Sequence, residues 1–160
     1  MKCDFLLNSA IELGMRIAII LKAYAPKALS AHELIILDHM LINSNDFYHD
    51  TESLYPKCNF RTSDIAEKKA VIKQALCLYL KKGIIKAHIT QTGMVYELGD
   101  AYNNFEACIE DSFVNELSKT AQKIYTSESN KDVSKLYQKW YDNTSSIRKN
   151  IEKPMFREIF

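Results

Sequence analysis

One stretch of this chain decides its fold: S-D-I-A-E-K-K-A-V-I-K-Q-A-L-C-L-Y-L-K-K-G-I-I-K-A-H-I-T-Q-T-G-M-V-Y-E-L, residues 63–98. Residues 64–82 predict an amphipathic helix, because apolar side chains recur at helical spacing and lysines face outward. Gly83 ends that helix. Residues 84–98 then alternate apolar and polar side chains around a turn at which Gly93 supplies a positive φ, so they predict a β-hairpin.

Two helices are expected before this stretch. Ser9 with Glu12, and Ser30 with Glu33, have the spacing of capping boxes at helix starts. An apolar stripe follows each cap at helical intervals. Gly14 lowers helix propensity inside the first helix, which predicts a close approach of another helix there.

Residues 43–63 form a long polar segment that predicts a loop. A loop of this length in a compact domain is usually functional or disordered. Several aromatic side chains are spread along it, and they favour a loop pinned to a surface over a disordered one.

Residues 99–160 predict further helices, at 101–110, from 112 onward, and from 131 into the 140s, with a polar break at 127–130. A sparse apolar stripe continues toward the C-terminus. The fold class predicted is therefore mainly α with a small β-hairpin. We expect a winged-helix-like domain over residues 5–98, including the long loop 43–63, and a helical C-terminal extension over residues 99–160.

Composition limits the classes of partner. The 160 residues include 21 basic and 20 acidic side chains, for a net charge of +1. That balance gives no bulk attraction to nucleic acid or to anionic lipid, so nucleic-acid binding would need a local patch. The apolar run at residues 17–21 is too short to span a bilayer and has charged neighbours, so a buried helix is expected rather than a membrane segment.

The four cysteines form no C-x-x-C pair, so neither a zinc site nor a disulfide framework is indicated. Cys77 is expected on the apolar face of its helix, where a free thiol acts as a small hydrophobe. Cysteines of this kind suit a reducing compartment, and we expect a cytoplasmic protein.

No catalytic motif is present: the sequence has no G-x-S-x-G, no phosphate-binding glycine loop and no H-E-x-x-H. Asp38 and His39 are adjacent, but neighbours on a helix point in different directions. They are interpreted as a polar helix edge rather than an acid–base pair. We expect no enzyme, no cofactor and no metal site.

Four short patterns, taken in order, resemble a known family. They are N-S-x-x-E-L-G-x-R at residues 8–16, L-x-x-L-D-H at 34–39, S-L-Y-P through Arg61 at 53–61, and L-x-x-K-K-G-I-I at 78–85. Together they resemble the middle component of the ABC-three-component systems, which include the small LmuC-type subunit of Lamassu anti-phage and anti-plasmid defence complexes. The resemblance covers residues 5–117 and depends on the order and spacing of the patterns.

The resemblance implies a non-catalytic subunit in prokaryotic defence. In such systems an SMC-like ATPase senses DNA, a separate subunit carries an effector domain that is often a nuclease, and the middle component connects the two. The implied partners are therefore the ATPase, the effector subunit, and double-stranded DNA as part of the complex.

Direct DNA contact would use the third helix and the wing, as winged helices do. The candidate residues are basic and lie before, on and after that helix: Arg61, Lys68, Lys69, Lys73 and Lys86. Bidentate base reading favours arginine, so a lysine patch points to backbone contact at most. The alternative is that these lysines solvate an exposed face.

Protein interaction is the stronger hypothesis, because aromatic side chains are common anchors of interfaces. The candidates are aromatic residues in polar surroundings: Phe47, Tyr48, Tyr55, Tyr137, Trp140, Phe156 and Phe160. The last helix could equally fold back on the domain, and that alternative stays open.

The sequence therefore predicts a bridging subunit of an SMC-type defence complex. The alternative is a stand-alone winged-helix regulator that binds DNA, and a weaker third reading is an enzyme. Stoichiometry, the activating trigger and the effector chemistry do not follow from the sequence.

Overall fold

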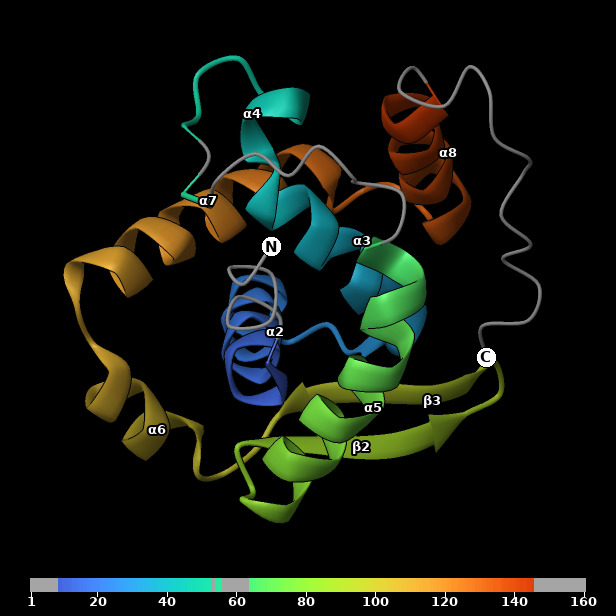
Figure 1. Ribbon diagram of the computed structural model, residues 1–160. Coiled ribbons are helices and arrows are strands. Elements are labelled where there is room, and N and C mark those ends of the chain that lie inside the picture. The colour runs from blue at the N-terminus through green and yellow to red at the C-terminus, as the bar shows by residue number, and fades with distance from the viewer. Residues whose placement is uncertain (1–8, 53, 56–63, 146–160) are drawn as a thin grey trace.

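The computed structural model describes residues 9–52, 54–55 and 64–145 (Figure 1). Helices dominate it, and a small sheet lies at one side. In chain order the elements are α2 (Ala10–Tyr24), β1 (Leu29–Ser30), α3 (Ala31–Ile42), α4 (Ser44–Phe47), α5 (Asp64–Lys81), β2 (Ile85–Thr90), β3 (Gly93–Leu98), α6 (Tyr102–Ile109), α7 (Ser112–Glu128) and α8 (Val133–Ser145). The predicted fold class, mainly α with a small hairpin, is confirmed.

The sheet is antiparallel, with strand order β1-β3-β2. The predicted hairpin is present, and it pairs Ile85 with Leu98 at its base and Thr90 with Gly93 at its tip. Leu29 pairs with Tyr96 and brings β1 onto the other edge of β3. This strand was not predicted, since two residues are too few to show a period. The assignment to the winged-helix class itself remains a prediction.

Helix α2 lies at the centre of the fold, where it packs against α3, α5 and α7 (Figure 1). Helix α2 contacts α5 at Gly14, the position of α2 that has no side chain. A Cβ placed at Gly14 would overlap the ring of Tyr79, and the Tyr79 hydroxyl donates a hydrogen bond of 2.7 Å to the carbonyl of Ile11. The predicted close approach at Gly14 is therefore confirmed.

The local signals at the ends of the helices also hold. Ser30 and Glu33 form the reciprocal capping box, and the Ser9 hydroxyl accepts from the Glu12 amide at 3.2 Å. Gly83 ends α5 with φ +69°, and Gly93 has φ +125° in the hairpin turn. Both glycines occupy backbone that other residues rarely adopt.

The part of the chain after β3 packs on the same core as the helices before it. Leu117, Ala121 and Ile124 of α7 and Leu136 of α8 belong to the buried apolar cluster that includes α2 and α3. Burial of these side chains supplies much of the driving force that holds α7 and α8 in place. Within the described residues, none of the helices combines the length and apolar character needed to cross a membrane.

Candidate functional site

The most concentrated charge in the described residues lies inside the protein, around Asp38 of α3. Arg16 of α2 approaches Asp38 with its Nε 2.5 Å from Oδ1 and its Nη2 3.2 Å from Oδ2. The Nζ of Lys68 on α5 lies 3.1 Å from Oδ2. All three side chains are at most 1% exposed. One carboxylate thus joins three helices through two cations.

This arrangement corrects the prediction that Lys68 faces outward as a DNA contact. Lys68 precedes Ile72 by four residues, Ala75 by seven and Tyr79 by eleven, which places it on the buried stripe of α5. A lysine on this stripe is tolerated because Asp38 provides a countercharge there. Lys68 is therefore not available to DNA.

Asp38 and His39 are also corrected. Both are fully buried on α3, so they do not form the polar helix edge expected from the sequence. Burial by itself would raise the pKa of the Asp38 carboxyl, but the charges and hydrogen bonds of Arg16 and Lys68 outweigh it and hold that pKa below its ordinary value. Asp38 is thus ionised and structural rather than a proton donor.

A second layer of polar groups closes the cluster. Glu12 Oε1 lies 3.5 Å from Nη1 of Arg16 and accepts a 2.7 Å hydrogen bond from the Tyr55 hydroxyl. The Arg16 guanidinium carbon lies 5.3 Å from the centre of the Tyr55 ring. Tyr55, which was predicted to be an interface residue, instead ties the long loop to the core.

A second polar centre lies at Glu128, the last residue of α7, which is 1% exposed. The Tyr48 hydroxyl donates to its Oε1 at 2.8 Å, Lys139 of α8 also contacts Oε1, and Nζ of Lys131 lies 2.8 Å from Oε2. Burial raises the pKa of the Glu128 carboxyl, but these three donors lower the pKa by more than burial raises it. The pKa of Glu128 therefore lies below its ordinary value. Glu128 thus joins α8 and the loop to α7.

The predicted aromatic interface is therefore partly internal. Phe47 and Tyr48 are half-buried beneath Lys139, whose Nζ lies 6.0 and 4.7 Å from their ring centres. Tyr137 of α8 is half-buried, with its ring 6.3 Å from that of His32. The side chain of Trp140 and the whole of Phe156, Phe160 and Arg61 lie outside the residues that the structure describes.

Of the other predicted DNA contacts, those that the structure describes do face solvent. Lys73 is exposed on α5, and Lys69 is half-exposed beside it. The Nζ of Lys86 on β2 is 3.3 Å from Glu97, so its charge is already balanced. The structure thus places Lys69 and Lys73 together on one face and Lys86 apart from them.

The tip of the hairpin is apolar. Ile89 and Met94 pair across the two strands and are 81% and 50% exposed. Ile89 was predicted on the half-buried face of its strand, and it does share that face with Ile85. The end of the hairpin extends beyond α5 (Figure 1).

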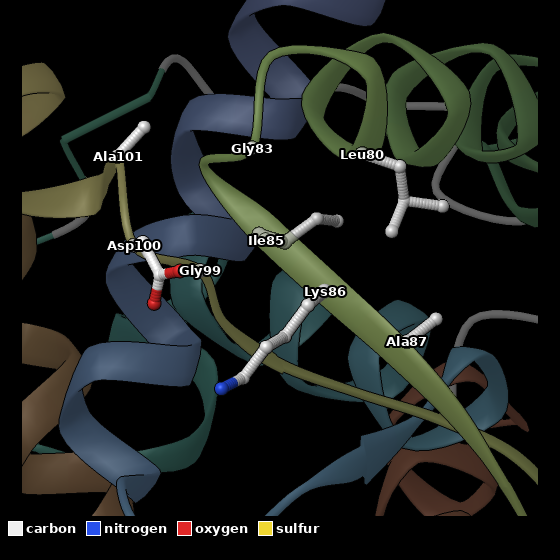
Figure 2. Close-up of a pocket in the computed structure, with 8 residues that line it drawn as sticks. All are labelled: Leu80, Gly83, Ile85, Lys86, Ala87, Gly99, Asp100 and Ala101. Atoms are coloured by element: carbon white, nitrogen blue, oxygen red, sulfur yellow. The ribbon is translucent and has the colours of Figure 1, made fainter.

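A pocket of about 360 Å³ lies at the base of the hairpin. Figure 2 shows Leu80 of α5 together with Ile85 and Ala87 of β2 on one side of the strand, while Lys86 points to the other side.

Cys77, predicted on the apolar face of α5, is exposed instead. Among the described residues, no three His, Cys, Asp or Glu side chains gather as a metal site would require.

The residues missed from the sequence had a recognisable signal. Arg16 and Asp38 each lie among the buried apolar residues of their helices, and opposite charges in two buried helices tend to pair.

Comparison with protein families gives a match over residues 6–150 to the model described as ABC-three component (ABC-3C) system Middle Component 2. Searches of curated proteins and of solved structures gave no match.

Proposed function

The chain belongs to the family of middle components of ABC-three component systems, and from this premise we propose that it is a non-catalytic adaptor. It would link an SMC-like ATPase to a nuclease-type effector subunit in a Lamassu-like complex that acts against phages or plasmids. The family match over residues 6–150 carries this proposal, because a middle component works with protein partners.

The arrangement of charged groups supports an adaptor over an enzyme. Arg16, Asp38 and Lys68 are closed off from solvent and form ion pairs with one another, and Glu128 is buried among its own donors. An active site needs such groups at a surface where a substrate can reach them. Here they hold helices together, which suits a rigid subunit that presents surfaces to two partners.

Reconstitution from the three subunits of the system tests the adaptor role. The ATPase and the effector are co-expressed with and without this chain, and complexes are separated by size-exclusion chromatography. An adaptor predicts one assembly that contains all three subunits, and no association of ATPase with effector when this chain is left out. Equal association of the two large subunits in its absence would overturn the proposal.

A stand-alone winged-helix regulator is the second candidate. The order α2, β1, α3, α5, β2, β3 with the sheet order β1-β3-β2 supports a winged-helix topology, and Lys69 and Lys73 lie on the helix that such domains present to DNA. This candidate predicts tight binding of a duplex by the isolated chain, with affinity that falls steeply as salt rises. Fluorescence anisotropy with a labelled duplex at two salt concentrations measures it.

A further inference from the structure

One surface of the molecule combines unbalanced positive charge with exposed apolar side chains. We call it the α5–hairpin surface and define it by Lys73, Cys77, Leu80 and Lys81 of α5 with Ile89 and Met94 of the hairpin. Helix α5 ends at Lys81 and β2 begins at Ile85, and the two elements run in different directions from this junction (Figure 1).

Three lysines of α5 face away from the buried Lys68–Asp38 pair. Lys69, Lys73 and Lys81 have no carboxylate within ion-pair distance in the part of the chain that the structure describes. Elsewhere, Lys86 is paired with Glu97 and Lys119 with Glu116. Lysines separated by four, eight and twelve residues lie along one side of a helix, so the charges of α5 add up on one face.

The floor between these lysines is apolar. Lys73, Cys77, Leu78 and Lys81, with Gln74, line a shallow hollow of about 410 Å³ on the exposed side of α5. Next to it, Leu80 faces Ile85 and Ala87 across the pocket of about 360 Å³ (Figure 2). The surface therefore has two hollows with apolar side chains in them, and Lys73 and Lys81 line the hollow on α5.

The hairpin extends this apolar surface outward. Ile85, Ala87 and Ile89 alternate along β2 and so lie on the same face of the sheet, and Met94 is the cross-strand partner of Ile89. Ile85 is buried, whereas Ile89 is 81% exposed. An exposed apolar pair at the end of a hairpin is a feature of binding surfaces, because contact of these side chains with water is unfavourable and a partner would cover them.

We propose that the α5–hairpin surface binds an acidic amphipathic helix of another subunit of the same system. Such a helix would place its apolar stripe on Cys77, Leu80 and Ile89 and its carboxylates on the lysines of α5, as helices docked in grooves do. The proposal rests on the adaptor function and names the chemistry of one of its partners.

Duplex DNA fits the same surface less well. DNA phosphates would form ion pairs with Lys73 and Lys81. The side chains of Ile89 and Met94, however, would face the charged DNA backbone without a hydrogen-bond donor. The cation of the hairpin, Lys86, lies on the opposite face of the strand from Ile89 and is paired with Glu97. A protein helix uses both the charge and the apolar tip, and DNA uses only the charge.

Charge reversal in the co-expressed system tests the proposal. The double variant K73E/K81E and the single variant I89D are compared with the double variant K119E/K135E, which reverses two exposed lysines on α7 and α8. We expect both α5–hairpin variants to weaken binding of one subunit by about tenfold or more and the control to keep it. Thermal melts establish that all three variants remain folded.

Photo-crosslinking locates the contact independently of affinity. Cys77 on α5 and Cys108 on α6 are both exposed free thiols, so a benzophenone maleimide can be placed on either one in a chain whose other cysteines are serine. In the assembled complex, crosslinking from Cys77 is expected to identify a peptide rich in Asp and Glu with helical apolar spacing. Crosslinking from Cys108 is not expected to reach that peptide.

The outcomes separate this proposal from the adaptor role. Unchanged assembly with K73E/K81E and I89D would overturn the proposed surface while the adaptor role stands. Failure of the wild-type chain to associate with any subunit would overturn both. Loss of duplex binding by K73E/K81E, with subunit binding unchanged, would assign the surface to DNA and overturn the acidic helix.

Discussion

The ring of Tyr79 on α5 occupies the space that a side chain at Gly14 on α2 would fill, and its hydroxyl is anchored 2.7 Å from the carbonyl of Ile11. The two helices thus meet at a point where one contributes only backbone. Phe105 of α6 also packs edge-on against this ring, with 5.4 Å between ring centres. This contact fixes how closely α5 approaches the centre of the fold.

Gly14→Ala is expected to destabilise the protein. Alanine by itself would stabilise the helix by up to about 1 kcal/mol, but the overlap with the Tyr79 ring requires repacking that costs about 1–3 kcal/mol. We therefore expect a net loss in the free energy of unfolding, measured by urea denaturation. In a Tyr79→Ala background the ring is absent, and the same substitution should be neutral or stabilising; equal effects in both backgrounds would contradict the contact.

The charge cluster around Asp38 predicts a strong asymmetry between its members. Asp38→Asn leaves Lys68 buried without a countercharge and leaves Arg16 with only its 3.5 Å contact to Glu12, which is expected to cost about 3–5 kcal/mol in the free energy of unfolding. Lys68→Met keeps the two-bond pair between Arg16 and Asp38 and removes the second cation from that carboxylate, so it should be close to neutral. Chemical denaturation of the two variants measures the difference. A larger loss for Lys68→Met than for Asp38→Asn would contradict the arrangement.

The same cluster predicts sensitivity to acid. The pKa of Asp38 is lower in the folded protein than its ordinary value of 3.8, so its contribution to stability is present above that value and is lost as the pH falls through the folded pKa. We expect the wild-type protein to lose stability below about pH 4. The more exposed ion pair between Lys86 and Glu97 provides the control. The variant Glu97→Gln leaves Lys86 in solvent and should retain this acid dependence.

The pH dependence of Lys68→Met is informative in a second way. That variant keeps Arg16 against Asp38, so the carboxyl pKa should remain depressed and the loss of stability in acid should persist. Urea midpoints at several pH values below 5 measure it. Urea midpoints of Lys68→Met that do not change with pH would mean that Lys68 lowers the pKa of Asp38. That result would contradict Arg16 as the main cause of the low pKa.

The sequence predicted the elements well because their signals are local. Ser30 with Glu33, Gly83 and Gly93 each act within a few residues, and each has the predicted role. The glycine at position 14 was also interpretable, because an unfavourable residue inside a helix needs a reason. Strand β1 escaped prediction because Leu29 pairs with Tyr96, a residue far away in the chain.

The candidate site was harder to predict because it depends on which elements meet. Lys68 looks like any other lysine until Asp38 is placed opposite it, since neither residue carries the pairing in its own segment. The alternation along its strand predicts a half-buried Ile89, but this side chain is 81% exposed at the end of the hairpin. Pattern sets the direction of a side chain, and tertiary packing decides what that side chain meets.

Glu128 offers a test of how α8 is held. Glu128→Gln removes the charge that Lys131 and Lys139 contact but keeps an oxygen for the Tyr48 hydroxyl. We expect a loss of about 1–3 kcal/mol in the free energy that holds α8 and the loop in place. The effect stays local because Lys131 and Lys139 can rotate into solvent. Hydrogen exchange should then speed up over residues 133–145 and 44–52 and stay unchanged in α2, where the buried core does not depend on this carboxylate.

Glu116→Gln is the matched control for this variant. Glu116 lies on the same helix α7 and also contacts a lysine, with Lys119 Nζ 2.6 Å away, but the pair is exposed to solvent. Exposed pairs of this kind contribute about 0–1 kcal/mol, because water replaces the lost contact. Exchange in α8 should therefore match the wild type in Glu116→Gln. Wild-type exchange in α8 for Glu128→Gln as well would mean that α8 is held by its apolar face, through Leu136, rather than by Glu128.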